Sequence, residues 1–308
     1  MSTVGLVQLL YAALAVVMAG LGLSLRPSDF ARLRSQVGPT VLALVLQMVV
    51  LPLVAFGLTV IFNLNGYLAV GMILLAATPG SITANLYSHL FGGDVAFNVA
   101  LTGVNTFLCA LTLPFLGSWA LAHYVGEGQM LPILFDKALQ TISIVVIPVL
   151  LGMTIAAKAP RIAERVDKPV KILSAALVVI FSIAGIIKEW DTLVRGFAQV
   201  GSAILIFNAA CLFLGFVAAR LARLGRRACI TIAFQASIHN AIQAIYVGIA
   251  VLNEPLAALP AAVYSITMNI FALGFGLIVQ HHARSSAPSP EVGTHAFAAV
   301  GQERPRRR

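Results

Sequence analysis

Residues 74–85 read Leu-Leu-Ala-Ala-Thr-Pro-Gly-Ser-Ile-Thr-Ala-Asn, and residues 232–243 read Ile-Ala-Phe-Gln-Ala-Ser-Ile-His-Asn-Ala-Ile-Gln. Each stretch lies inside an apolar run of helical length. Pro79 removes a backbone donor and Gly80 loosens the chain in the first, while the second holds five polar residues in nine positions. Because unsatisfied polar groups are costly in hydrocarbon, both predict broken helices with inward-facing polar residues. The alternatives are a simple proline kink and interhelical hydrogen bonds.

The composition predicts an all-α polytopic membrane protein. Hydrophobic residues make up 59% of the 308 residues and charged residues only 10%, against about 45–50% and 25% in soluble domains. This excludes a soluble enzyme, a disordered chain and a nucleic-acid-binding domain, in spite of a net charge of +9. A membrane span needs about 20 apolar residues. Nine segments meet this length: 4–25, 38–63, 66–91, 95–122, 132–157, 171–187, 199–219, 229–252 and 257–280.

The charged residues predict the orientation of these spans. With nine spans, seventeen of the twenty Lys and Arg residues fall on one side, which the positive-inside rule assigns to the cytoplasm. We therefore expect a multi-pass protein of the bacterial inner membrane, with the N-terminus outside and the C-terminus inside. Residues 1–282 would form the membrane domain, and residues 283–308 a disordered basic tail that anchors the topology. The first apolar run is expected to be a retained span rather than a signal peptide.

The two interrupted spans carry the functional prediction as a pair. They are the third and the eighth, and they cross the membrane in opposite directions, as the broken helices of an inverted-repeat transporter do. Each second half-helix would begin near the midplane with free N–H groups, which favour an anion. No Lys or Arg lies deep inside any span. The polar stripe Asn98, Thr102, Asn105 and Thr106 has helical spacing and is expected to face the crossing.

Several motifs resemble the bile acid:sodium symporter family, and specifically its bacterial members. They are residues 21–30 (Leu-Gly-Leu-Ser-Leu-Arg-Pro-Ser-Asp-Phe), Gln47 with Leu51-Pro52, Thr78-Pro79-Gly80-Ser81 through Asn85, residues 93–102, and Asn240. The resemblance covers residues 10–280. It implies a core domain with two crossed broken helices beside a panel domain. Bacterial members typically have ten spans, and this chain is expected to lack the first of them, which leaves nine as in the animal members.

The resemblance also implies two sodium sites. The first corresponds to Asn85, Asn98, Thr102 and Gln235, and the second to Gln47, Gln235, Ala236, Ile238 and His239. Gln235 stands where the family has a glutamate shared by both sites, and Ala84, Asn98 and His239 also depart from the pattern. At about 4 Å and an effective dielectric of about 20, one lost charge removes roughly 4 kcal/mol of attraction per ion. We therefore expect family-type coupling to two sodium ions to be lost.

Three modes of coupling stay open: one sodium ion at the first site, proton coupling through His239, and uncoupled diffusion. The candidate substrate contacts line the breaks and the stripe: Thr78, Pro79, Gly80, Ser81, Ser237, Asn240 and Asn105. The expected substrate is a small organic anion. The sequence does not distinguish among pantoate-like acids, keto acids and steroids. The expected partners are this anion and the lipid bilayer, without nucleic acid or an obligate protein partner. We expect no cofactor beyond a coupling Na⁺ or H⁺.

Other protein classes fit the sequence less well. An intramembrane enzyme would need a reactive set, and all Asp and Glu residues lie in loops, the tail or span ends. Ser237 and His239 are only two positions apart and would face different sides of a helix. The alternative carriers are arsenite-permease-like or auxin-efflux-like, and the arsenite type would need a reactive cysteine in a broken helix. The scattered Cys109, Cys211 and Cys229 predict neither a disulfide framework nor a metal cluster.

Overall fold

The computed structural model describes residues 3–126, 131–163, 165, 166, 169, 173 and 190–285. Throughout these ranges the regular structure is helical, and the extended pairing consists of one isolated bridge. The predicted all-α fold class is therefore confirmed.

The helices follow the chain with bounds close to those of the predicted spans. They are α1 (Thr3–Ser24), α2 (Pro27–Ser35), α3 (Val37–Val45), the π-helix η1 (Leu46–Val50), α4 (Leu51–Ile61), α5 (Gly66–Ala77), α6 (Ile82–Leu90), α7 (Val95–Tyr124), α8 (Leu131–Lys158), α10 (Trp190–Leu221), α11 (Arg226–Ser237), α12 (Ala241–Tyr246), the π-helix η3 (Val247–Val251) and α13 (Pro255–Ser285). The predicted span 171–187 lies outside the described residues except at Leu173. Of the predicted tail, residues 283–285 continue α13, and the rest lies outside the described residues.

Four helices are long and apolar enough to cross a membrane: Val37–Ile61, Val95–Tyr124, Phe197–Leu221 and Pro255–His282. A fifth span is added when Tyr11–Ser24 and Ser28–Ser35, which meet at 66°, are taken together. The predicted spans 66–91 and 229–252 do not pass this length test, because each is divided into two shorter helices. The chain is thus a multi-pass membrane protein, and the total of nine spans stays a prediction.

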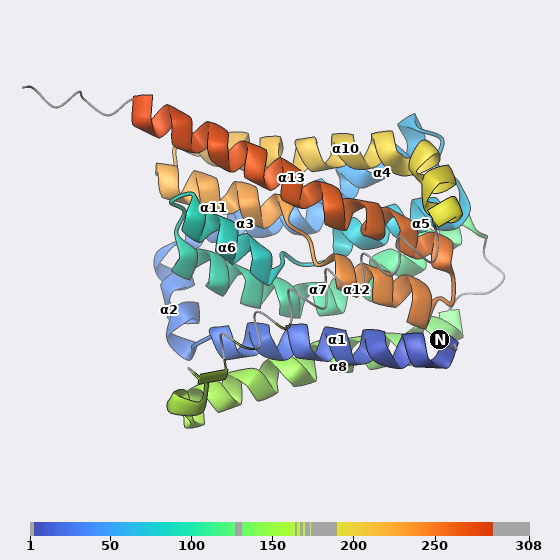
Figure 1. Cartoon of the computed structure of the whole chain (residues 1–308), viewed down its shortest axis with the longest axis horizontal. Helices are drawn as coiled ribbons and strands as arrows, with labels where there is room; N and C mark the ends of the chain where they lie inside the picture. The colour runs from blue at the N-terminus through green and yellow to red at the C-terminus, as the bar shows by residue number, and fades with distance from the viewer. Residues whose placement is uncertain are drawn as a thin grey trace, which may run out of the picture.

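The two divided spans lie at the centre of the helix bundle. Figure 1 shows α6 and α11 side by side on one side of the two breaks, and α5 and α12 on the other. The helices α7, α10 and α13 and the α3–α4 span surround them. This arrangement places the unwound segments where neighbouring helices exclude lipid.

The helices α1 and α8 pack along each other at one edge of the bundle (Figure 1). Their backbones approach closely at two glycines. A Cβ atom on Gly22 would lie 2.1 Å from the carbonyl oxygen of Val149, and one on Gly152 would lie 2.4 Å from that of Ala19. Small residues allow such close contact between membrane helices.

Candidate functional site

The two breaks cross each other and satisfy each other's backbone groups. Gly80 and His239 form an antiparallel bridge. On either side of it, the Ser81 N–H donates to the Ile238 carbonyl at 2.8 Å, and the Asn240 N–H donates to the Pro79 carbonyl at 2.9 Å. An unwound backbone is tolerated at this depth only when protein groups satisfy it. The predicted breaks in both helices are confirmed, and Pro79, Gly80 and Ser81 lie in the crossing itself.

Each second half-helix begins directly after the crossing. Ser81 caps α6, with its hydroxyl accepting from the Thr83 N–H at 3.4 Å, and Asn240 caps α12, with its Oδ1 accepting from the Gln243 N–H at 3.2 Å. Two helix N-termini therefore lie at the crossing, as the sequence predicts. Their partial positive charge favours an anionic ligand.

A first polar cluster joins α6, α7 and α11 beside the crossing. Asn98 donates from Nδ2 to the Ser88 hydroxyl at 2.9 Å, and the Thr102 hydroxyl lies 3.0 Å from Gln235 Oε1. Asn85 lies one turn before Ser88 on α6. All five side chains are buried. Hydrogen bonds thus join three of the residues predicted for the first ion site, Asn98, Thr102 and Gln235, and add Ser88, while Asn85 lies on the same helix face as Ser88.

This cluster contains oxygen atoms without a donor. Asn85 Oδ1 and Asn98 Oδ1 are buried and accept no hydrogen bond from any described residue, and Gln235 Nε2 likewise has no partner there. The Thr102 hydroxyl also lies 2.9 Å from the Asn98 carbonyl, and its single proton serves one acceptor at a time. If Thr102 donates its proton to the Asn98 carbonyl, the Gln235 amide can take the opposite orientation. Gln235 Nε2 would then donate to the Thr102 hydroxyl, and Gln235 Oε1 would be left without a donor. The surrounding hydrogen bonds decide between the two orientations of such an amide.

Gly80 allows the crossing to approach Gln235. A Cβ atom at this position would lie 2.3 Å from Gln235 Nε2, 2.6 Å from Cδ and 2.8 Å from Oε1. Gln235 is itself buried, so its amide has little room to move aside. The glycine in the first break therefore leaves room for a side chain of α11, the helix that ends at the second break.

A second polar cluster lies at the crossing around the Thr78 carbonyl. Gln47, in the π-helix η1, donates from Nε2 to this carbonyl at 2.9 Å. The Nδ1 atom of His239 lies 3.3 Å from the same carbonyl and 3.3 Å from Gln47 Nε2. The structure thus places Gln47 and His239 of the second predicted site together, at the carbonyl of Thr78, a predicted substrate contact.

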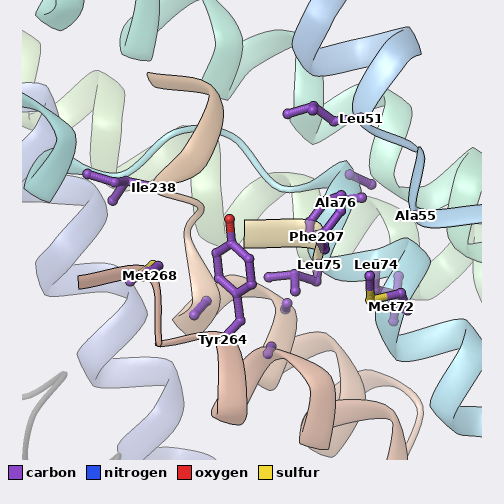
Figure 2. Packing of buried hydrophobic residues seen from close by; sticks show 14 of the residues in the cluster. Leu51, Ala55, Met72, Leu74, Leu75, Ala76, Phe207, Ile238, Tyr264 and Met268 are labelled. Carbon is purple, nitrogen blue, oxygen red and sulfur yellow. The ribbon is translucent and has the colours of Figure 1, made fainter. Parts of the chain in front are cut away.

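The other side of His239 is enclosed by residues of α10 and α13. Its ring stacks on Phe207 with centroids 5.7 Å apart and meets Tyr264 edge-on at 5.4 Å. Its Nε2 lies 3.9 Å from Cys211 Sγ. Tyr264 donates to the Ser237 carbonyl at 2.6 Å. Figure 2 shows Tyr264 and Phe207 in this apolar packing. In the described part of the chain, every hydrogen-bonding or ring contact of His239 is therefore neutral.

The remaining predicted residues, Ser237 and Asn105, make local contacts within their own helices. The Ser237 hydroxyl donates to the Phe234 carbonyl at 3.5 Å. Asn105 accepts from Cys109 Sγ at 3.4 Å within α7, so no described bond joins it to the crossing. All members of the predicted stripe on α7 are buried, which confirms that this face is directed inward.

Sequence reasoning missed three contributors, Ser88, Phe207 and Cys211. Ser88 has a signal in its i, i+3 spacing from Asn85, which puts both on one face of α6. Phe207 and Cys211 lie in an apolar run whose pattern does not indicate which residues approach His239. Across the described residues, no group of three or more His, Cys, Asp and Glu side chains could hold a metal ion.

These features define a class: a polytopic membrane protein in which two broken helices cross and carry buried polar clusters, as in secondary transporters. The Sodium Bile acid symporter family matches residues 11–195, and the chain belongs to this family. The resemblance seen in the motifs is thereby confirmed, and the chain is a membrane transporter of this family.

Curated relatives align along most of the chain. A rice protein named "Probable sodium/metabolite cotransporter BASS1, chloroplastic" is 26% identical over 84% of this chain, which spans 62% of that relative's length. The "Uncharacterized sodium-dependent transporter YocS" of Bacillus subtilis is 26% identical, with 83% of this chain and 78% of the relative covered. The human "Ileal sodium/bile acid cotransporter" is 26% identical, with 90% and 81% covered.

Proposed function

We propose that this protein is a secondary transporter that moves a small organic anion by alternating access and couples it to one sodium ion. The observation that carries the proposal is the pair of unpartnered oxygens, Asn85 Oδ1 and Asn98 Oδ1, buried beside the crossing. The proposed sodium ligands are these two oxygens with Thr102 and the Gln235 amide. Relatives named as sodium/metabolite and sodium/bile acid cotransporters support the same type of function.

The chemistry of this cluster suits a sodium ion as co-substrate. Sodium is a hard cation, and hard cations prefer carbonyl and hydroxyl oxygens. A buried carbonyl oxygen without a donor costs free energy, and a bound cation would offset that loss. The buried polar side chains of the described residues include no carboxylate. A neutral oxygen set of this kind would bind sodium weakly, and the carboxylate of the transported anion would add the missing negative charge.

The second predicted site is proposed to hold no sodium ion. There, Gln47 Nε2 already donates to the Thr78 carbonyl, and His239 Nδ1 lies within hydrogen-bonding distance of both. A protein donor thus occupies the Thr78 carbonyl, and one side-chain oxygen of this cluster, Gln47 Oε1, is left without a donor among the described residues, against two in the first cluster. The apolar enclosure of His239 by Phe207 and Tyr264 supports a structural role over a proton relay.

The proposed substrate class follows from the charges around the crossing. Two helix N-termini begin there, and the buried side chains of the described residues include no Lys or Arg that would hold an anion more tightly. The protein would act as a carrier rather than an enzyme, with its N-terminus outside and its C-terminus in the bacterial cytoplasm. It would need no obligate protein partner.

Uptake into proteoliposomes tests the proposed coupling. Labelled pyruvate, pantoate and taurocholate would be offered with an inward sodium gradient, a proton gradient, or neither. We expect sodium-driven accumulation of at least one anion, abolished in Asn98→Leu and retained in His239→Gln. Accumulation driven by protons and lost in His239→Gln would instead make the histidine the coupling residue. Equilibration without accumulation under either gradient would show an uncoupled carrier.

A further inference from the structure

Two buried polar side chains on α12 are not used by the site described above. Gln243 and Tyr246 are fully buried, Gln243 Nε2 has no hydrogen-bond partner among the described residues, and the Tyr246 hydroxyl interacts with Tyr11 on α1. Gln243 and Tyr246 are three positions apart, which places both side chains on one face of the helix. A buried N–H donor without an acceptor, such as Gln243 Nε2, is unfavourable unless another state of the protein satisfies it.

The orientation of the Gln243 amide follows from its neighbour. Asn240 Oδ1 accepts from the Gln243 N–H at 3.2 Å, which fixes Oδ1 as the inward end of the Asn240 amide. Asn240 Nδ2 then donates to Gln243 Oε1 at 3.5 Å. The free end of Gln243 is therefore its Nε2 atom, which can only donate. The unpartnered group beside Tyr246 is thus an N–H donor.

The helix α1 packs against α12 at Tyr246. The ring of Tyr11 on α1 meets the ring of Tyr246 edge-on, with centroids 4.9 Å apart and planes at 73°. The rest of α1 packs along α8 at the edge of the bundle, as Figure 1 shows. Tyr11 therefore covers Tyr246, and a movement of α1 relative to α12 would free the Tyr246 hydroxyl on the helix face that it shares with Gln243.

We propose that Gln243 and Tyr246 form a substrate-recognition site that binds carboxylate oxygens of the transported anion once Tyr11 has moved away from Tyr246. This proposal rests on the proposed function, since it names the residues that would recognise its substrate. Two neutral donors suit a carboxylate, because amide N–H and phenol O–H groups bind anions well in a site shielded from water. They hold it without the strong attraction of a buried Lys or Arg, so the anion can also be released.

Conservative variants test this site. Tyr246→Phe removes one hydroxyl, and Gln243→Met removes the amide at similar size. For an anion that the wild type accumulates, each is expected to raise KM about tenfold or more, because a hydrogen bond to a charged group is lost. The maximal rate should change much less. Gln243→Glu should abolish uptake, since it replaces the donor by a carboxylate. Tyr124→Phe is the matched control, because it removes a phenol that pairs with Thr59 away from the crossing.

The outcomes separate this proposal from the proposed function. No accumulation by the wild type would overturn both. Accumulation by the wild type with unchanged KM in Tyr246→Phe and Gln243→Met would overturn only the recognition site. Should a variant be too unstable for uptake assays, thermal unfolding with and without the same anion gives a second measurement. The anion should raise the Tm of the wild type and of Tyr124→Phe. An equal rise in the two α12 variants would contradict the proposal.

Discussion

Replacing Gln235 by glutamate is expected to raise the affinity for sodium by about tenfold to a thousandfold. The variant adds a negative charge within the proposed ion site, where Gln235 contacts Thr102. A full charge about 4 Å from the ion, at an effective dielectric of about 20, contributes roughly 4 kcal/mol. Each 1.4 kcal/mol corresponds to about a tenfold change in affinity. The lower end of the expected range, a tenfold rise in sodium affinity, allows for the free energy of burying the carboxylate.

Thermal unfolding in sodium chloride and in choline chloride measures this effect. In choline, Gln235→Glu should unfold at a lower temperature than the wild type, because its buried carboxylate has no counter-ion. Sodium should restore most of that loss. Asn208→Asp is the matched control: Asn208 is a buried amide bonded to Thr267, outside the proposed site. It should be destabilised equally in both salts. Equal destabilisation of Gln235→Glu in the two salts would remove Gln235 from the ion site.

Gly80→Ala should weaken sodium-driven transport by about 5- to 150-fold. The added Cβ would lie 2.3–2.8 Å from the amide atoms of Gln235, and crowding of a packed interior typically costs about 1–3 kcal/mol. The amide would be displaced from Thr102, so the loss should appear as a higher sodium concentration for half-maximal uptake. Gly57→Ala is the control, since nothing lies within 4 Å of a Cβ at that position.

Circular dichroism would establish whether the helices of Gly80→Ala remain intact. An unchanged sodium dependence in a folded Gly80→Ala protein would contradict the proposed link between the first break and the ion site. A general loss of structure would show instead that this glycine is needed for the crossing to form. Measuring the sodium dependence of uptake in the Gly80→Ala protein that remains folded then distinguishes a damaged ion site from a general loss of structure.

The breaks could be predicted from sequence because their signals are local. Pro79 and Gly80 disfavour a continuous helix, and the polar residues from Gln235 to Gln243 cannot face lipid. The spans around them follow from hydrophobic length alone. The same local rules placed Asn98 and Thr102 on one inward face of α7, where the structure has them buried.

The contacts across the crossing could not be predicted in this way. The approach of Cys211 and Phe207 to His239 depends on how α10 rotates against α11, which a uniformly apolar segment does not encode. The contact between Tyr11 and Tyr246 likewise joins two helices far apart in sequence. Such tertiary choices come from side-chain packing in three dimensions rather than from periodicity.

Binding of radioactive sodium to the purified protein at saturation would show how many ions the chain holds and where. We expect one sodium ion per chain, lost in Asn98→Leu and retained in His239→Gln, because the proposed ion lies among Asn85, Asn98, Thr102 and Gln235 rather than at the Thr78 carbonyl. Two ions per chain would contradict the proposal that the second predicted site, at Gln47 and His239, holds no sodium ion. No saturable binding in the presence of a transported anion would contradict the sodium site altogether.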